Sequence, residues 1–254
     1  MTVHALIPAA GRGERLRAPA SAPSGSQLAA LPKQFLPVAG RPLLVWAVER
    51  LHRAGVDAIV VAAPAEMLDE TRELLRGVQR ARVVTGGATR QDSVARALHG
   101  SQATNGDLVL VHDAARAAVH PDDVRATIAA AAASDADGAV LGRPMTDTVK
   151  RLLAGRIEET IERSALFRAE TPQVFRREVL ARAIERAVAD GFVGTDESSL
   201  VERLPGARIV AVVAQWPNPK VTFASDLERL ERMLPERGAR GTESGGPAAA
   251  SPAR

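Results

Sequence analysis

Short apolar runs alternate with segments of helical pattern along much of the sequence, and this alternation restricts the possible folds more than any other feature. Apolar runs occupy residues 3–8, 58–63, 82–84, 108–111 and 138–141. Helices are predicted between them at residues 42–53, 66–75, 92–98 and 121–133. Strands that alternate with helices at this spacing predict an α/β fold with a doubly wound, mostly parallel sheet that is covered on both faces.

The alternation breaks after Pro144, where the pattern becomes that of a β-hairpin arm at about residues 145–163. Polar alternation surrounds Thr148, and Gly155 supplies a turn. Such an arm has too little core to be stable alone, so we expect it to pack against a second subunit and to be used for dimerisation. A disordered insertion is the alternative, and it is disfavoured because the apolar side chains of Val149, Leu152, Leu153 and Ile157 require burial.

The rest of the chain completes a single predicted domain over residues 1–234. Helices are expected at 177–189, 196–204 and 224–234, and a last strand at 208–214. Residues 235–254 are rich in Gly, Ala, Pro and Ser and are predicted to be a disordered tail. Residues 17–31 have a similar composition and are expected to form a mobile surface loop.

Composition excludes several classes of protein. No apolar run approaches the roughly 20 residues that span a bilayer, and the sequence contains no Cys, so disulfides and thiolate metal sites are absent. The net charge is only +3, and basic residues do not cluster with aromatic ones, which disfavours nucleic acid as a partner. We therefore expect a soluble, cytoplasmic protein that binds neither a membrane nor nucleic acid.

Lysine is rare in this chain and marks candidate sites. Of the 33 Lys and Arg residues, only Lys33, Lys150 and Lys220 are Lys. A compact ammonium is not interchangeable with a planar guanidinium. We interpret Lys33 and Lys220 as functional and leave the role of Lys150 open. The alternative is that all three lysines occur by chance.

A loop of small residues follows the first apolar run. Ala9, Ala10, Gly11 and Gly13 expose backbone N–H groups that can approach an anion closely, and Arg15 and Lys33 bracket the loop. No Lys follows Gly13 as in a Walker loop, and Leu16 occupies the third glycine position of a dinucleotide fingerprint. The loop therefore predicts a phosphate site of another kind.

Polar residues also follow two other predicted strands, at the edge of the sheet where ligands bind in such folds. Gly86, Gly87, Arg90 and Ser93 follow the third strand, and residues 112–116 follow the fourth. Asp113 is a candidate Mg²⁺ ligand, because Mg²⁺ takes carboxylate oxygen together with substrate phosphates. A helix cap or an ion pair with Arg116 is the alternative for Asp113.

No nucleophile–base pair is evident: the chain has no Cys, and no Ser lies in a Gly-x-Ser-x-Gly turn. This agrees with phosphoryl or nucleotidyl transfer, in which the protein positions reactants and neutralises charge.

Taken together, the motifs resemble those of the 2-C-methyl-D-erythritol 4-phosphate cytidylyltransferase family, over about residues 3–234. Any one motif is weakly specific, but their order along the chain is strongly so. They are Ala9-Ala10-Gly11-Arg12-Gly13-Glu14-Arg15, Pro32-Lys33-Gln34, residues 86–94, residues 111–116, Asp147-Thr148-Val149-Lys150, Thr171-Pro172-Gln173, Thr195-Asp196-Glu197 and Lys220-Val221-Thr222.

The resemblance implies a Rossmann-like nucleotidyltransferase that transfers CMP from CTP to 2-C-methyl-D-erythritol 4-phosphate and releases pyrophosphate, in the non-mevalonate route to isoprenoids. It implies that Arg15 and Lys33 stabilise charge on the α-phosphate, and that the enzyme is a homodimer using Mg²⁺ at Asp113. The implied nucleotide site comprises Ala9, Ala10, Gly11, Gly13, Gly87, Arg90, Ser93, Asp113 and Ala114, and the implied acceptor site comprises Arg116, Thr148, Arg163, Thr171 and Lys220. Thr148 and Arg163 would serve the neighbouring subunit.

Two other functions remain open. A cytidylyltransferase for another polyol phosphate, such as ribitol 5-phosphate, would share the nucleotide half of the site. A catalytically silent, nucleotide-binding regulator is disfavoured, because Arg15, Lys33, Asp113 and Lys220 are all present.

Overall fold

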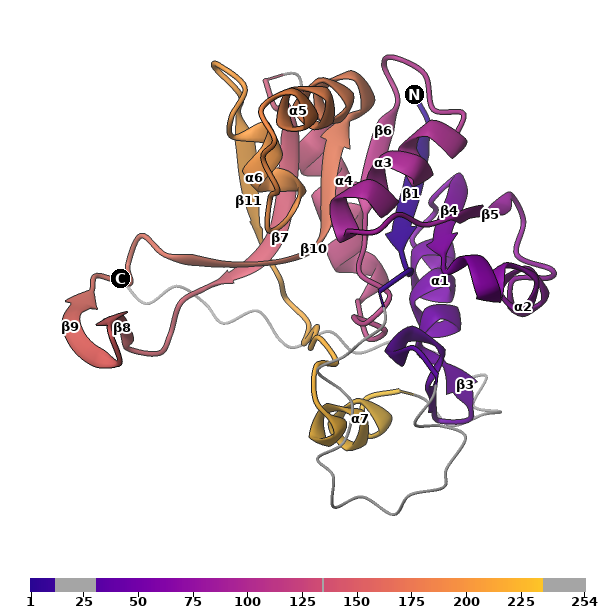
Figure 1. Cartoon of the computed structure of the whole chain (residues 1–254), viewed down its shortest axis with the longest axis horizontal. Helices are drawn as coiled ribbons and strands as arrows, with labels where there is room; N and C mark the ends of the chain where they lie inside the picture. The colour runs from indigo at the N-terminus through magenta and orange to yellow at the C-terminus, as the bar shows by residue number, and fades with distance from the viewer. Residues whose placement is uncertain (12–30, 134, 235–254) are drawn as a thin grey trace.

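A seven-stranded sheet forms the centre of the protein in a computed structural model, which describes residues 1–11, 31–133 and 135–234. Figure 1 shows the strands in the order β11-β7-β10-β6-β1-β4-β5. All neighbours pair in parallel except β10, which is antiparallel to β6 and β7. The strands are β1 Val3–Pro8, β4 Ala58–Ala63, β5 Ala81–Thr85, β6 Leu108–Val111, β7 Gly138–Pro144, β10 Phe167–Arg176 and β11 Ile209–Val213. The predicted mostly parallel α/β sheet is confirmed.

Strand β10 is absent from the sequence prediction. Its sequence, FRAETPQVFR, mixes charged residues with a proline, which cannot donate to a strand ladder. The structure accommodates this by a register shift against β7 between Ala169 and Gln173, where the Thr171–Pro172 peptide bond is cis. In the sheet, the antiparallel β10 lies between β7, which pairs in parallel with β11, and β6, which pairs in parallel with β1.

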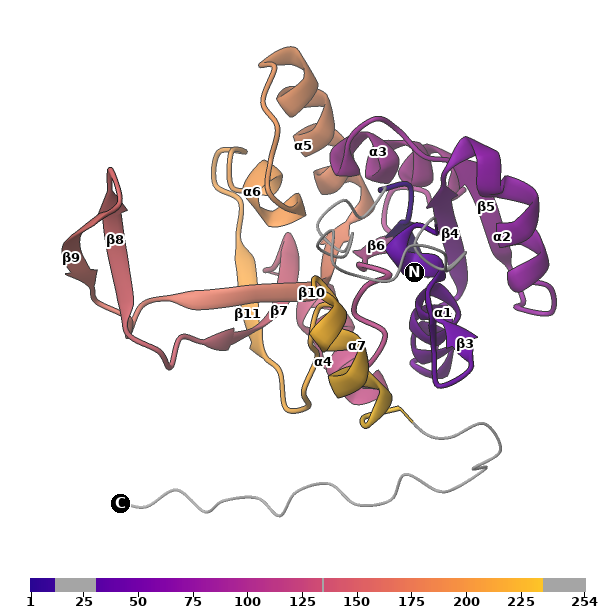
Figure 2. The same cartoon turned by 60° about the horizontal axis from the view of Figure 1, so that its bottom comes forward.

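Helices cover both faces of the sheet (Figure 2). Helices α1 (Leu43–Arg53), α2 (Leu68–Leu74) and α4 (Pro121–Ala132) pack on one face, and α3 (Arg90–Gly100), α5 (Arg177–Ala189) and α6 (Glu197–Val201) pack on the other. Helix α3 begins two residues earlier than predicted, because Thr89 caps it by accepting a hydrogen bond from the Asp92 backbone N–H.

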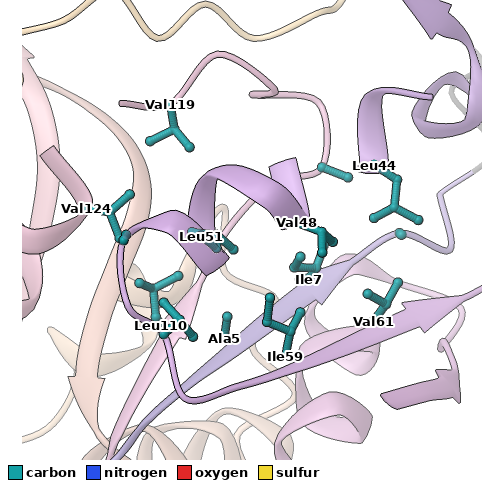
Figure 3. Close-up of a cluster of buried hydrophobic side chains, with 14 of the residues drawn as sticks. Ala5, Ile7, Leu44, Val48, Leu51, Ile59, Val61, Leu110, Val119 and Val124 are labelled. Atoms are coloured by element: carbon teal, nitrogen blue, oxygen red, sulfur yellow. The ribbon is translucent and has the colours of Figure 1, made fainter. Parts of the chain in front are cut away.

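The two cores alternate along each strand. Successive side chains of a strand point to opposite faces, so Ala5 and Ile7 of β1 pack with Leu44 and Val48 of α1, whereas Leu6 joins the core under α3 and α5. Figure 3 shows the first of these clusters, with Ile59, Val61 and Leu110 from neighbouring strands. This burial on both faces explains why the strands contain few polar residues.

Small elements complete the edge of the sheet that carries the site. A third apolar cluster joins Trp46 of α1, Ala115, Val221 and Leu230 of α7. It holds the segment before α7 against the loop that follows β6. The small elements are η3 Lys33–Phe35, β2 Pro37–Val38, β3 Arg41–Pro42, η4 Ala65–Met67 and α7 Ala224–Glu231.

The predicted hairpin arm is present as β8 (Val149–Leu153) and β9 (Arg156–Ile161), which pair antiparallel. Figures 1 and 2 show that it projects away from the sheet. Leu152, Leu153 and Ile157 are 64%, 65% and 67% exposed, so these side chains are not buried within the described part of a single chain. The predicted tail at 235–254 and nearly all of the predicted loop at 17–31 lie outside the described residues. No helix of the described part is long and apolar enough to cross a membrane.

Candidate active site

A cavity of about 760 Å³ opens at the carboxyl ends of β1, β4, β5 and β6. This is the edge of the sheet at which the sequence places its polar motifs. Of the predicted site residues, the cavity is lined by Ala9, Ala10, Gly11, Lys33, Gly87, Arg90, Ser93, Asp113, Ala114 and Lys220. Gly13 and Arg15 lie outside the described residues.

The loop after β1 is held in place by Gln34. The buried side-chain amide of Gln34 donates hydrogen bonds to the backbone carbonyls of Ala9 and, over 3.1 Å, of Gly11. The N–H of Ala9 donates to Ala62 at the end of β4. Gln34 stands in the Pro-Lys-Gln motif, but no local sequence pattern indicates its role; its contacts identify it as the residue that fixes this loop.

The turn after β5 is equally compact. A Cβ atom at Gly86 would lie 2.2 Å from the Cβ of Ala10, and one at Gly87 would lie 2.1 Å from the Cβ of Asp92. The Gly87 N–H donates to Ser93 Oγ over 3.0 Å, which in turn donates to the Thr89 carbonyl. The N-terminus of α3 is therefore directed at the cavity, a position that favours a bound phosphate.

Four charged side chains of alternating sign form a row at the cavity: Arg90, Asp113 and Lys220 line it, and Glu197 lies behind Arg90. Arg90 lies between two carboxylates: Nη1 is 2.7 Å from Glu197 Oε1, and Nε is 3.1 Å from Asp113 Oδ1. Lys220 Nζ is 2.7 Å from the other oxygen of Asp113. Asp113 thus pairs with Arg90 and Lys220 rather than with Arg116, the partner considered from the sequence.

These pairs determine the protonation states. Burial alone would raise the pKa of Asp113, but Arg90 and Lys220 outweigh it and hold that pKa well below its usual range. Burial alone would lower the pKa of Arg90, but Glu197 and Asp113 outweigh it and raise that pKa above its usual value. The guanidinium therefore stays charged. Burial raises the pKa of Glu197, against the effect of Arg90. Asp113 and Arg90 therefore stay ionised at neutral pH.

His112 and Thr171 fix the backbone of Asp113. Burial lowers the pKa of His112 to about 4, so its ring is neutral at neutral pH. Its Nε2 lies 3.2 Å from the Arg116 carbonyl, which only accepts, so we assign the proton to Nε2. Nδ1 then accepts from Thr171 Oγ1 over 3.1 Å, and that oxygen accepts from the Asp113 N–H over 3.1 Å. His112 is therefore a fully buried, packed residue directly after β6.

Arg116 and Thr171 lie behind Asp113 rather than in the cavity lining. Arg116 Nη1 donates to the Asn218 carbonyl over 2.7 Å and lies 3.8 Å from buried Glu170. Its pKa is lowered by burial, although Glu170 opposes this. Both residues therefore adjoin the cavity wall on its Lys220 side.

Thr148 and Arg163 are not brought to the cavity by this chain. Both are exposed on the arm, where Arg163 Nη1 donates to the Thr146 carbonyl over 2.5 Å. A site that uses them needs a second subunit.

The side chains at the cavity determine whether a divalent cation could bind there. Among the described residues, no group of three or more His, Cys, Asp or Glu side chains could hold a metal. Mg²⁺ is typically held by one or two carboxylates together with substrate phosphates and water. Asp113 therefore fits as the carboxylate of an Mg²⁺ that arrives with a triphosphate.

Small-residue loops, a helix N-terminus and cations at the carboxyl edge of a doubly wound sheet are typical of enzymes that bind nucleotide phosphates. Comparison with known proteins identifies the family. The chain belongs to the 2-C-methyl-D-erythritol 4-phosphate cytidylyltransferase family, whose sequence profile matches residues 3–236. The predicted family and class of enzyme are confirmed.

Individual relatives agree. A 2-C-methyl-D-erythritol 4-phosphate cytidylyltransferase of Acidobacterium capsulatum is 40% identical over 248 residues, which cover 94% of this chain and 100% of that protein. The crystal structure of the enzyme of that name from Thermus thermophilus matches with a TM-score of 0.70 and 31% identity, over 91% of this chain and 100% of the other. The Francisella tularensis structure matches with a TM-score of 0.75 and 28% identity, over 92% and 100%.

Proposed function

We propose that this cavity carries out the reaction of its family. The chain transfers the cytidylyl group of CTP to the phosphate of 2-C-methyl-D-erythritol 4-phosphate, giving 4-diphosphocytidyl-2-C-methyl-D-erythritol and pyrophosphate in isoprenoid precursor biosynthesis. The observation that carries the proposal is the convergence in one cavity of the loop after β1, the N-terminus of α3, Lys33, Asp113 and Lys220.

The chemistry explains why cations dominate the site. A phosphate oxygen of the acceptor attacks the α-phosphorus of CTP, a new P–O bond forms, and the bond to the β-phosphate oxygen breaks so that pyrophosphate leaves. Both reactants are anions, so their repulsion must be offset before any bond forms. We assign this role to Lys33 and to Arg15.

The nucleotide half of the cavity binds CTP through backbone and polar groups. The loop at Ala9, Ala10, Gly11 and Gly13 and the Gly87 turn contact phosphates and base through N–H groups that only small residues leave accessible. Ser93, Arg90 and Ala114 complete this half.

We assign Asp113 to the ribose and the metal. A bound Mg²⁺, or another divalent cation, would neutralise triphosphate charge and polarise the α-phosphate. This chain contributes the Asp113 carboxylate, which its cationic neighbours keep ionised.

The acceptor half is built around Lys220, with Arg116 and Thr171 beside it. Thr148 and Arg163 complete it from the arm of a second subunit in a homodimer. The exposure of Leu152, Leu153 and Ile157 on the arm supports this assembly, because exposed apolar patches commonly mark interfaces. Light scattering of the purified protein tests it: a dimer is expected, and a monomer at assay concentration would contradict it.

The proposed substrates are two small, charged molecules, so the reaction requires neither a membrane nor nucleic acid. This agrees with the modest net charge of +3. We therefore place it in the cytoplasm.

A direct test compares acceptors at fixed CTP. Turnover with 2-C-methyl-D-erythritol 4-phosphate, and little with ribitol 5-phosphate, is the expected result. Turnover of ribitol 5-phosphate alone would reassign the acceptor. CTP binding without turnover of either acceptor would favour a catalytically silent, nucleotide-binding regulator.

A further inference from the structure

Glu197 lies behind the cavity wall and takes no part in the cavity lining. It is the first residue of α6, whereas Arg90 is the first residue of α3. The Glu197 side chain is 1% exposed and the Arg90 side chain is 31% exposed. The carboxylate is therefore shielded from solvent, whereas its partner Arg90 reaches the cavity.

Burying a carboxylate is costly unless it is paired. Glu197 Oε1 accepts from Arg90 Nη1 over 2.7 Å, while Oε2 is buried without a hydrogen-bond partner in the part of the chain that the structure describes. A residue that served only to stabilise α6 would not require this burial of charge. The contact therefore points to a role that acts through Arg90.

The surrounding backbone holds Glu197 in register with Arg90. Gln91, next to Arg90, accepts from the Gly194 N–H over 3.0 Å and donates to the Phe192 carbonyl over 3.2 Å. Asp196 caps α6 by accepting from the Ser199 N–H. The first turn of α3 is thus joined to the segment that leads into α6 by contacts that do not involve Glu197 itself.

The second partner of Arg90 is Asp113, which the proposed function assigns to the ribose and the metal. When Asp113 engages a ligand, its contact with Arg90 Nε is the one at risk. Glu197 is remote from the cavity and keeps its hold on Nη1. Arg90 therefore stays oriented by Glu197 even when Asp113 binds a ligand instead.

We propose that Glu197 is a positioning residue that fixes the Arg90 guanidinium toward the bound nucleotide when Asp113 is engaged by ligand. The proposal rests on the proposed function, in which Arg90 belongs to the nucleotide site. Its effect is on CTP binding rather than on the chemical step, because Arg90 contacts the nucleotide in the ground state.

The test compares Glu197→Gln, Arg90→Met and the double variant with the wild-type protein. Glu197→Gln keeps the shape and removes the charge. The KM and Kd for CTP should rise about tenfold, since a hydrogen bond to a charged group is lost as a positioning contact, while kcat changes less. In the Arg90→Met background the same substitution should add nothing, because the residue through which it acts is gone.

Glu178→Gln is the matched control, since Glu178 lies in the first turn of α5, is absent from the cavity lining and accepts a hydrogen bond from the Gly106 N–H over 3.2 Å. It should leave the KM for CTP unchanged. An unchanged KM in Glu197→Gln, a lowered KM, or an equal rise in the Arg90→Met background would each overturn the proposal.

If Glu197→Gln does not fold, Glu197→Asp is used instead. The aspartate keeps the negative charge but is one methylene shorter, so its carboxylate lies farther from Arg90. Glu197→Asp should raise the KM for CTP when Arg90 is present but not in the Arg90→Met background. An equal rise in both backgrounds would refute the positioning role. Calorimetric CTP binding without acceptor separates the two proposals. Wild-type protein that binds CTP but does not turn over acceptor contradicts the proposed function alone, and protein that does not bind CTP contradicts both.

Discussion

Lys220 and Asp113 are separated by 107 residues in the sequence, yet their side chains form a 2.7 Å ion pair at the cavity wall. The backbone supports this pair: the Val221 N–H donates to the Ala115 carbonyl over 2.9 Å, and Lys33 Nζ donates to the Val221 carbonyl over 3.3 Å. One short segment before α7 therefore holds both lysines relative to Asp113, and three distant parts of the chain meet at one point.

Lys33→Met should lower kcat about 10²- to 10³-fold, because loss of one preorganised donor from a developing phosphate charge has an effect of this size. Arg15→Ala should do the same. Steady-state kinetics measure the effect, and thermal unfolding should show little change. Lys150→Met serves as the control for Lys33→Met, since Lys150 lies on the exposed arm and bonds only Thr160 in that part of the structure. A near-normal kcat in Lys33→Met would show that the cation is misassigned.

Thr171→Val should destabilise the protein by about 1–3 kcal/mol, because it leaves the Asp113 N–H buried without an acceptor. The activity should fall with it, since Asp113 loses a backbone contact. Thr171→Ser keeps the hydroxyl and should retain both properties. Urea denaturation and kcat/KM are the measurements; a valine variant as stable as the wild-type protein would remove Thr171 from this supporting role.

Gly86→Ala should destabilise the fold by about 1–3 kcal/mol and weaken CTP binding, because the new methyl group would displace the loop at Ala10. Gly11→Ala provides the contrast for stability alone, since a Cβ there meets no atom within 4 Å. Differential scanning calorimetry on both variants measures the difference. Equal midpoints would mean that the Gly86 turn is less tightly packed than described.

Asp107 predicts a pH dependence of stability. Backbone hydrogen bonds from Thr104 and Thr2 hold the pKa of this carboxyl below its usual range. A carboxyl with a lower pKa when folded stabilises the protein above its unfolded pKa of about 4, and this contribution is lost as the pH falls through the folded pKa. Asp107→Asn should therefore lower stability at pH 7 and flatten the loss of stability below about pH 4. Urea titrations between pH 3 and 7 measure both effects, and parallel curves for the two proteins would contradict the assignment.

The sequence was informative where one local property decides the structure. Strands β1, β4 and β6 are continuous apolar runs because both faces are buried, and they were predicted within their observed bounds. Strand β10 escaped prediction because Pro172 and its charged neighbours carry no local strand pattern; its pairing partners in β6 and β7 determine its structure.

The candidate site divides in the same way. Gly87, Ser93 and Lys33 could be proposed because small residues and an isolated lysine are visible in the sequence. The pairing of Arg90 with Glu197, and of Gln34 with the Ala9 loop, joins residues far apart along the chain. No local pattern specifies which distant carboxylate or carbonyl a side chain meets, so these contacts required the structure.

The central claim is tested most directly by pyrophosphate release from the purified protein with Mg²⁺ and 2-C-methyl-D-erythritol 4-phosphate, with CTP compared in parallel with ATP, GTP and UTP. We expect release that requires both CTP and this acceptor. Release with another nucleotide in preference to CTP, or no release with any of the four, would contradict the assignment of this cavity as a cytidylyltransferase site.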